Sequence, residues 1–512
     1  MILANGLVRT MDPSLPTAAA LAIAGDLVAG GVGTHERALP SPERVDLGGR
    51  CVVPGLNDAH VHFPSWALAR REVRLEGATS IDEALARVRE ALALLAPGHW
   101  LRGRGWRSAD WNPAVEPTKE ALDAVTGAVP AVLRARDGHS LWLNSAALAR
   151  AGGDLAVDGG VVEVDASGRP TGVLREESAW RFEERHVETS LDELVEATRS
   201  ALRVANARGV TAIHDKDGAF AVPVWQRLHA QLNLSVRVWQ SIPHERLDLL
   251  SGLGFRSGLG DDLLRIGYLK VFMDGTLGSQ TARLLDGSGV AITSGEELRE
   301  IIRRGAAAGF GLAVHAIGDG ANRAALDAFE ATQDAWRPPG LRPRIEHAQL
   351  LAPGDLERFG RLGIGASVQF SHAPSDRDLV ERFWADAADR AYPFRSLFET
   401  GALVANGSDA PVEELDPLLG LRAGVLRTLD ERPAWRPQQA VTVEQALTAT
   451  TVNPALLAGD ERRRGRLAPG YLADLVVLDR DPVTCAPEEL TELAVVATML
   501  GGRWVHNPPP WD

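Results

Sequence analysis

Eight short apolar segments alternate with longer amphipathic segments along the middle of the chain, and this alternation constrains the fold more than any other feature. Short apolar runs are typical of buried strands, and the segments between them have helical spacing. Strands that alternate with helices pair in parallel, and eight such units form a (β/α)8 barrel of the TIM type. The predicted strands are Val52–Val53 leading into Ala59–His60, Val210–His214, Val236–Ile242, Ile266–Phe272, Gly311–His315, Arg344–His347, Gly365–Gln369 and Leu403–Asn406.

The two ends of the chain have a different pattern, with short strand-like runs separated by Pro and Gly. Examples are Ala19–Ala24 near the N-terminus and Ala473–Asp479 near the C-terminus. Neither end has enough apolar surface to form a core alone. We therefore expect the ends to pack together as one β domain, built from residues 1–54 and 461–512, around a barrel of residues 55–63 and 196–460.

Residues 64–195 lie between the first two barrel strands and are too numerous for a loop. This stretch predicts an inserted α+β subdomain with a helix at Ser80–Leu95 and a strand at Ala131–Ala135. It holds six of the thirteen tryptophans of the chain. Such a subdomain suits a lid over a binding site, with Trp106 and Trp142 contacting an apolar or aromatic substrate. The alternative is that these indoles form the core of the subdomain.

Composition excludes several classes of function. The chain has 54 Lys and Arg against 68 Asp and Glu, a net charge of −14, so we expect neither a nucleic acid nor an anionic membrane as partner. Two cysteines cannot form a disulfide framework. No run approaches the roughly 18 to 20 apolar residues that span a bilayer. The apolar run Ala18–Ala24 is broken by Gly25 and lacks the basic flank of a signal peptide, so a cytoplasmic protein is expected.

Several predicted strands end in residues that can bind a metal. The first strand leads into His60-Val-His62, two later strands end at His315 and His347, and Asp409 follows the last strand. The carboxyl ends of barrel strands meet on one face, where active sites form. Two histidines one residue apart on a strand point to the same side and can reach one cation. One such pair is weak evidence, but its coincidence with other strand ends predicts a metal site.

Lys270 lies in the fourth apolar strand, where a charged ammonium group would be costly to bury. The chain has only three lysines among its 54 basic residues, so a lysine in this place is unusual. Burial lowers the pKa of a lysine and leaves a neutral, nucleophilic amine. Such an amine can take up CO2 and become a carbamate that bridges two metals. The alternative is a lysine paired with Asp274 or extending to the surface.

The same residues lie in segments that resemble the amidohydrolase superfamily. Val53–His62 resembles its first metal motif, and Gly465–Asp479 resembles its C-terminal β segment. Five further segments resemble the family-3, YtcJ-like amidohydrolases, whose members include N-substituted formamide deformylases. These segments are Asp137–Leu148, Thr171–Glu176, Lys270–Ser279, His315–Gly320 and Asn406–Pro411. The resemblance covers nearly the whole chain and implies a barrel with a composite β-sandwich domain, an inserted subdomain and metal-dependent hydrolysis of a C–N bond.

Position by position, the resemblance implies that His60 and His62 hold one metal and that His315 and His347 hold a second. Carboxylated Lys270 would bridge them, and Asp409 would be a further ligand and the general base. One or two divalent ions are compatible with the family pattern. The imidazole and carboxylate ligands favour Zn²⁺, with Mn²⁺ or Fe²⁺ as alternatives.

The predicted activity is hydrolysis of an amide or formamide bond of a small molecule by water activated on the metal. His139 is a candidate catalytic residue that reaches the carbonyl or the leaving group of the substrate, and the alternative is a histidine bonded within its own turn. Gln369 is expected to contact the substrate, and Asp274 is expected to line the pocket. Two alternatives stay open: a hydrolase or deaminase of a cyclic amide or ester on the same site, and a metal-free binding protein without catalysis. A homodimer is also left open.

Overall fold

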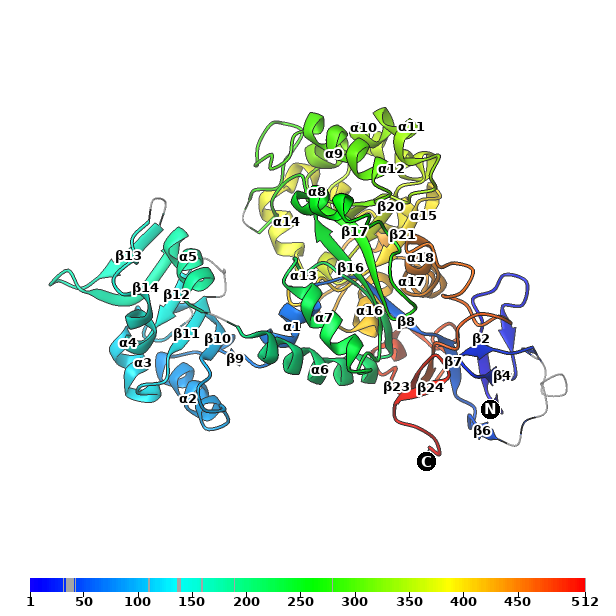
Figure 1. Ribbon diagram of the computed structural model, residues 1–512, viewed down its shortest axis with the longest axis horizontal. Helices are drawn as coiled ribbons and strands as arrows, with labels where there is room; N and C mark the ends of the chain where they lie inside the picture. The colour runs from blue at the N-terminus through cyan, green and yellow to red at the C-terminus, as the bar shows by residue number, and fades with distance from the viewer. Residues whose placement is uncertain are drawn as a thin grey trace. The chain divides into compact units, whose positions relative to one another are not determined.

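The structure is a computed structural model, shown in Figure 1. It describes residues 1–512 except 31, 34–40, 42, 109–110, 136–139, 158–159, 188, 279 and 512, and only the backbone of residues 176 and 177. The chain forms two compact units. One comprises Met1–Trp66 with Thr198–Asp512, and the other comprises Ala67–Ala197.

The larger unit is built around an eight-stranded parallel sheet that curves into a nearly closed barrel, as predicted. Its strands, in chain order, are β8 (Leu56–Val61), β15 (Val210–Asp215), β16 (Arg237–Pro243), β17 (Leu264–Phe272), β18 (Leu312–Ala316), β19 (Arg344–His347), β20 (Gly365–Val368) and β21 (Leu403–Asn406). Neighbours in the sheet follow chain order, so the carboxyl ends of all eight strands lie on one face.

The predicted start of the first barrel strand is wrong. Val52 and Val53 belong to β7 (Cys51–Pro54), which lies in a different sheet, and the barrel strand begins at Leu56. Gly55 separates the two strands, and a Cβ atom there would lie 2.2 Å from the Thr211 hydroxyl oxygen. The chain therefore passes from one sheet to the other at a point where only glycine fits.

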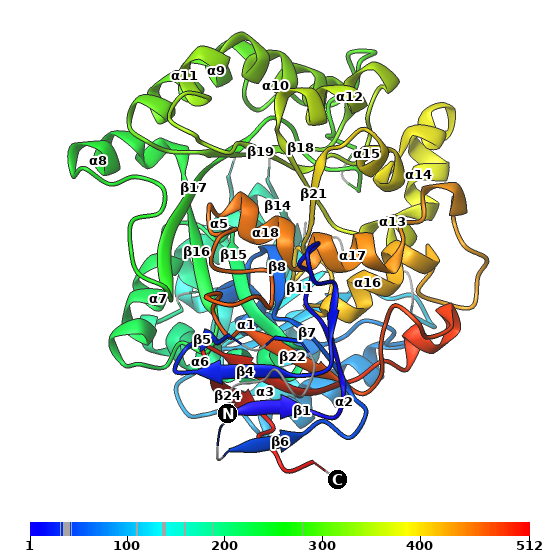
Figure 2. The ribbon, with the colours of Figure 1, turned by 90° about the vertical axis from the view of Figure 1, so that its right-hand side faces the viewer.

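Amphipathic helices cover the outside of the barrel strands, and Figure 2 shows α9, α10 and α12 beside β18, β19 and β21. Helix α9 (Gly295–Ala307) begins with a capping box between Ser294 and Glu297 and buries Leu298 and Ile302. Helices α10 (Asp319–Ala331) and α12 (Pro353–Leu362) pack in the same way. Their apolar faces join the strands in one core, which fixes the strand ends that carry the candidate site.

The two ends of the chain form two smaller sheets of the larger unit, and the second of these contains strands from both ends. The first has the order β5-β4-β1-β6 and the second the order β24-β23-β22-β7-β2-β3. Strand β7 pairs antiparallel with β22 (Leu475–Leu478), so residues more than 400 positions apart share a ladder. The other strands are β1 (Ile2–Ala4), β2 (Leu7–Arg9), β3 (Thr17–Ala18), β4 (Leu21–Ala24), β5 (Leu27–Val28), β6 (Arg44–Asp46), β23 (Val495–Leu500) and β24 (Arg503–His506).

The second unit has its own six-stranded sheet, in the order β13-β14-β12-β11-β10-β9, and its own core. Helix α2 (Ile81–Leu92) and strand β11 (Ala131–Ala135) agree with the predicted helix and strand of this region. The remaining strands are β9 (Val73–Arg74), β10 (Leu101–Trp106), β12 (Ser140–Leu143), β13 (Gly160–Val164) and β14 (Pro170–Glu176).

In the part of the chain that the structure describes, every helix is too short or too polar to cross a lipid bilayer.

Candidate metal centre

Three side chains from distant parts of the sequence converge at the carboxyl ends of the barrel strands. His60 comes from β8, His347 ends β19 and Asp409 follows β21, and one potential ligand atom of each lies within 4.8 Å of the others. His60 Nε2 lies 3.3 Å from Asp409 Oδ1, and His62 Nε2 lies 3.6 Å from the same oxygen. The ring of His315 adjoins that of His347, with centroids 4.5 Å apart. All four predicted histidines therefore lie in one cluster with Asp409.

The backbone makes this convergence close. A Cβ atom at Gly407 would lie 2.3 Å from the backbone nitrogen of His60, so only glycine lets β21 approach β8 at this level. The Asp409 amide then donates to the His60 carbonyl at 2.7 Å. Asp409 and His347 both have positive φ angles, 59° and 75°. Residues other than glycine rarely adopt this conformation, and such strain clusters at functional sites.

Hydrogen bonds fix which ring nitrogen of each HxH histidine is available. His60 Nδ1 lies 2.7 Å from Glu346 Oε2, and His62 Nδ1 lies 3.1 Å from Asp217 Oδ1. Because a carboxylate only accepts, Nδ1 carries the proton in both rings. Nε2 is left with its lone pair, and His60 Nε2 is buried without a hydrogen-bond partner among the described residues.

The other two histidines are oriented by different groups. Nδ1 of His347 donates to Gln369 Oε1 at 2.8 Å, which leaves its Nε2 available. Nε2 of His315 donates to the Gly275 carbonyl at 3.0 Å, which leaves its Nδ1. Each of the four rings therefore uses one nitrogen for orientation, and the other nitrogen is not used by that contact.

The electrostatics of the cluster suit ligand chemistry. Burial, together with the charge of Lys270, holds the pKa of His60 well below its usual range and lowers that of His315 to about 3. Burial and the neighbouring histidines lower the pKa of His347 as well. These imidazoles are neutral, the state in which they bind metal. Burial opposes the proton on His62, but its contacts with Asp217 and Asp409 outweigh that effect and raise its pKa, so metal binding there releases a proton.

Lys270 lies on β17 with 5% of its surface exposed, and burial lowers its pKa. Its Nζ lies 4.8 Å from the centre of the Phe272 ring. Within the described residues, no carboxylate pairs with this amine. The expected alternative, a pair with Asp274, is therefore not formed.

The family of the chain follows from comparison with known proteins. The sequence pattern of the Amidohydrolase family matches residues 43–506. The chain belongs to the amidohydrolase family.

Two relatives and one solved structure match this amidohydrolase over nearly its whole length. The amidohydrolase YtcJ of Bacillus subtilis (strain 168) is 31% identical and covers 94% of this chain and 95% of its own. N-substituted formamide deformylase of Arthrobacter pascens is 30% identical, and the match covers 98% of this chain and 97% of the relative. The crystal structure of a metal-dependent hydrolase of Pyrococcus horikoshii OT3 has a TM-score of 0.82 at 28% identity. The match covers 95% of this chain and 99% of that chain. The resemblance to YtcJ-like amidohydrolases is thus confirmed.

Two residues predicted to contact substrate make other contacts in this amidohydrolase. Gln369 is 2% exposed and orients His347. Asp274 is fully buried and accepts hydrogen bonds from the amides of Ile317, Gly318 and Arg283. Burial raises its pKa to about 6 although these bonds oppose the shift. These contacts give both residues structural roles, and a role in binding substrate stays a prediction without support from them.

The two tryptophans predicted to contact substrate lie in the core of the inserted unit. Trp106 is 2% exposed and Trp142 is 0% exposed. The indole N–H groups donate to the carbonyls of Leu133 and Thr118, each at 2.8 Å. This burial supports the alternative interpretation, in which the indoles pack a core. His139 lies outside the described residues.

Four charged residues around the cluster had no assigned role at the sequence level. Glu346 contacts His60, Asp217 contacts His62, and Lys216 and Arg344 contact Glu346. The sequence could have indicated Glu346 because this residue directly precedes the predicted ligand His347. For Lys216 the signal was the rarity of lysine. Neither signal names the partner, because Lys216 and His60 lie 130 and 286 positions from Glu346 along the chain.

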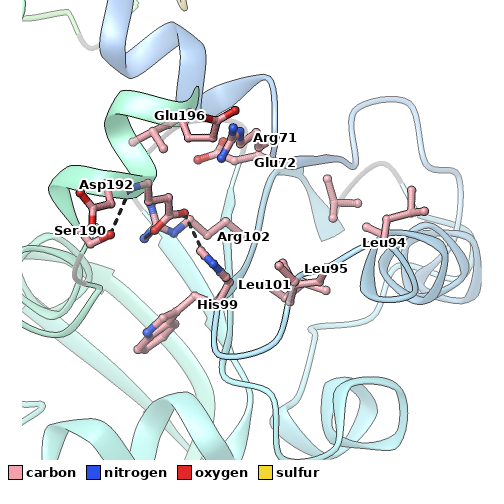
Figure 3. A pocket seen from close by; sticks show the side chains of 16 residues that line it. Arg71, Glu72, Leu94, Leu95, His99, Leu101, Arg102, Ser190, Asp192 and Glu196 are labelled. Carbon is pink, nitrogen blue, oxygen red and sulfur yellow. Dashed lines mark hydrogen bonds and ion pairs between the residues drawn. The ribbon is translucent and has the colours of Figure 1, made fainter. Parts of the chain in front are cut away.

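The inserted unit contains a cavity of about 750 Å³, shown in Figure 3. Leucines and Trp100 form much of its wall, and its polar side includes His99, Arg102 and Glu193. These polar groups lie close together, with His99 Nδ1 3.8 Å from Glu193 Oε1 and Arg102 4.0 Å from Glu193. None of the candidate metal ligands lines this cavity.

Proposed function

We propose that this amidohydrolase hydrolyses a C–N bond, of an amide or formamide, in a small molecule. The observation that carries the proposal is the cluster of His60, His347 and Asp409, with a buried His60 Nε2 that has no hydrogen-bond partner among the described residues. An unpaired buried acceptor is costly and persists where a ligand supplies the missing partner. The relative from Arthrobacter pascens, whose name is N-substituted formamide deformylase, supports the choice of bond.

The proposed ligands are His60 and His62 for one divalent ion and His315 and His347 for a second, with Asp409 beside both pairs. Imidazole and carboxylate ligands favour Zn²⁺, with Mn²⁺ or Fe²⁺ as alternatives, and one or two ions fit this set. When bound, such an ion polarises a carbonyl oxygen and makes water acidic enough to ionise near neutral pH.

Asp409 is the proposed general base. Burial raises the pKa of its carboxyl group, although the charges of His372, His62 and Lys270 oppose this effect. A carboxylate with a raised pKa is a stronger base than one in water. Asp409 takes the proton of the attacking water as the oxygen adds to the carbonyl carbon. It then delivers this proton to the leaving nitrogen, so that the C–N bond breaks with an amine as product.

Lys270 is the proposed site of carboxylation. In its deprotonated form the amine adds to CO2, an N–C bond forms, one proton leaves, and the product is an anionic carbamate. Lys216 is the other lysine buried in the barrel, but its Nζ lies 3.1 Å from Glu346 Oε1. Lys270 has no carboxylate within ion-pair distance in the described part of the chain, which supports Lys270 as the amine that reacts.

Metal content and substrate screening test the proposal together. Protein purified without chelator is expected to contain one or two equivalents of metal per chain, and His60→Ala/His62→Ala protein is expected to contain less. The metal-loaded enzyme is then assayed with N-substituted formamides, other small amides, cyclic amides and esters. Turnover of the last two classes alone would favour the alternative activity. Absence of metal after reconstitution with bicarbonate would contradict the proposal and favour a binding protein.

A further inference from the structure

A cluster of charged side chains lies inside the barrel next to the candidate histidines. Glu346 and Arg344 are fully buried and Lys216 is 4% exposed. Barrel interiors are normally filled by branched apolar side chains, and a buried ion pair is seldom more stable than an apolar packing of similar volume. These charges therefore call for a role besides stability.

We propose that Glu346 is a positioning residue, which orients His60 toward the metal and is itself held in place by Lys216 and Arg344. The inference rests on the proposed metal site. His60 Nδ1 donates to Glu346 Oε2 at 2.7 Å, and this bond turns His60 Nε2 toward Asp409 Oδ1 at 3.3 Å. A carboxylate on the far nitrogen of a ligating histidine fixes its tautomer and raises its basicity.

Two cations hold the Glu346 carboxylate on its other side. Lys216 Nζ lies 3.1 Å and Arg344 Nε lies 2.8 Å from Glu346 Oε1. Arg344 also donates to Glu346 Oε2 at 3.0 Å. Arg344 lies on β19 and Lys216 directly follows β15, and their three contacts leave the carboxylate little freedom. Its acceptor atom therefore stays beside the His60 ring.

Arg344 also connects the carboxylate to the backbone that carries His60. Its guanidinium donates to the Ala59 carbonyl at 2.6 Å, and it also contacts Ser367 on β20. On the opposite side it donates to His214 Nδ1 at 2.7 Å. Arg344 thus links β19 to β8, β15 and β20, and one side chain sets the position of both Glu346 and the strand that carries the HxH pair.

The larger unit contains a second buried ion pair that serves as a matched control. Asp474 accepts from Arg237 at 2.7 and 2.8 Å, and both residues are less than 10% exposed. No histidine contacts Asp474 in the described residues. Loss of this pair costs stability in the same way as loss of the Glu346 pair, but it leaves the orientation of His60 unchanged.

The experiment compares Glu346→Gln, Glu346→Met and Asp474→Asn with wild-type protein. Metal affinity is measured by competition with a chelator, and the ligand field is measured from the absorption spectrum of the Co²⁺-loaded protein. We expect Glu346→Met, which cannot accept a hydrogen bond, to bind metal about 100-fold more weakly, and Glu346→Gln, which can, about 10-fold more weakly. Both should change the cobalt spectrum. Asp474→Asn should lower the melting temperature and leave affinity and spectrum unchanged.

Wild-type affinity and an unchanged cobalt spectrum in Glu346→Gln would overturn the inference. If Glu346→Met does not fold, Glu346→Gln decides alone, because it is nearly isosteric. An equal loss of affinity in Asp474→Asn would also overturn it, since general destabilisation would then explain the effect. The proposed function fails separately, when the wild-type protein itself binds no metal. Metal bound by the wild-type protein and unaltered in the Glu346 variants would refute only the positioning role.

Discussion

The candidate metal centre and the core of the inserted unit both bury polar side chains, but the polar atoms differ in whether they have hydrogen-bond partners. In the inserted unit, the rings of Trp106, Trp111 and Trp142 lie 6.1 to 6.4 Å apart. The indole nitrogens of Trp106 and Trp142 reach backbone carbonyls of the same unit. In the barrel, His60 Nε2 has no hydrogen-bond partner among the described residues and faces Asp409.

This difference separates residues that build a core from residues that perform chemistry. A buried polar atom with a partner stabilises the fold, whereas one without a partner costs free energy unless a ligand completes it. Changes in the barrel cluster should therefore alter metal binding and turnover more than stability. Changes in the tryptophan core should do the opposite.

The largest effect is expected from Lys270→Ala. Loss of the amine removes the proposed bridging carbamate, so turnover should fall to background and bound metal should decrease, as measured by kinetics and elemental analysis. The variant should fold, because Lys270 forms no ion pair in the described structure. In wild-type protein loaded with ¹³CO2, a carbamate signal should be present and should be absent from Lys270→Ala. Full activity of the variant would exclude the bridging role.

Asp409→Asn should have the next largest effect. The amide keeps nearly the same shape but cannot take a proton, so kcat should fall by about 10²- to 10⁴-fold, the usual contribution of a general base. Part of the bound metal should remain, because the histidines are unchanged. Steady-state kinetics and metal analysis measure both quantities. Near-wild-type kcat would exclude Asp409 as the base.

Trp142→Ala tests the other side of the comparison. Removal of a fully buried indole should destabilise the inserted unit by about 3–5 kcal/mol, measured by denaturant unfolding. The kcat and KM of the folded protein should stay near wild type. A raised KM for bulky amides with unchanged stability would instead support the predicted contact with substrate.

The smallest effect is expected from pH. Burial raises the pKa of Asp274 to about 6 in the folded protein, against about 4 in an unfolded chain. The folded state therefore takes up this proton first as the pH falls. The stability gained from it is complete below pH 4 and is lost as the pH rises through 6.

Unfolding of wild-type and Asp274→Asn protein at pH 4.5 and pH 7 measures this contribution. Wild-type stability relative to the variant should be greater at pH 4.5, by about 1–3 kcal/mol. The loss in Trp142→Ala should be the same at both pH values, because an indole does not titrate. A pH-independent difference for Asp274→Asn would contradict the raised pKa.

Much of the fold was predictable from local patterns. The apolar segments around Val210, Leu269 and Val404 mark barrel strands because a parallel strand buried on both faces reads as a continuous apolar run. His60 and His62 were predictable as a pair because side chains alternate along a strand. Val52 and Val53 were assigned to the barrel strand, although the predicted domain boundary lies after residue 54, because they have the same apolar character whichever sheet they join.

The partners of the candidate ligands were not predictable. Glu346, Asp217 and Gln369 each orient one histidine, but nothing in the spacing of these residues indicates which ring they contact. Whether the tryptophans lie in a core or in a substrate pocket was also not predictable. An indole in a core and an indole in a substrate pocket are the same residue in the sequence, and only burial distinguishes them.

The sequence by itself determined the barrel and the residue types that gather where the barrel strands end, because strand periodicity and apolar burial act locally. Only the tertiary structure decided which nitrogen of each histidine is available, which buried lysine is left without an anion among the described residues, and which carboxylate faces His60. These outcomes depend on hydrogen bonds and ion pairs between residues from different strands. Such contacts exist only after the strands have closed into a barrel.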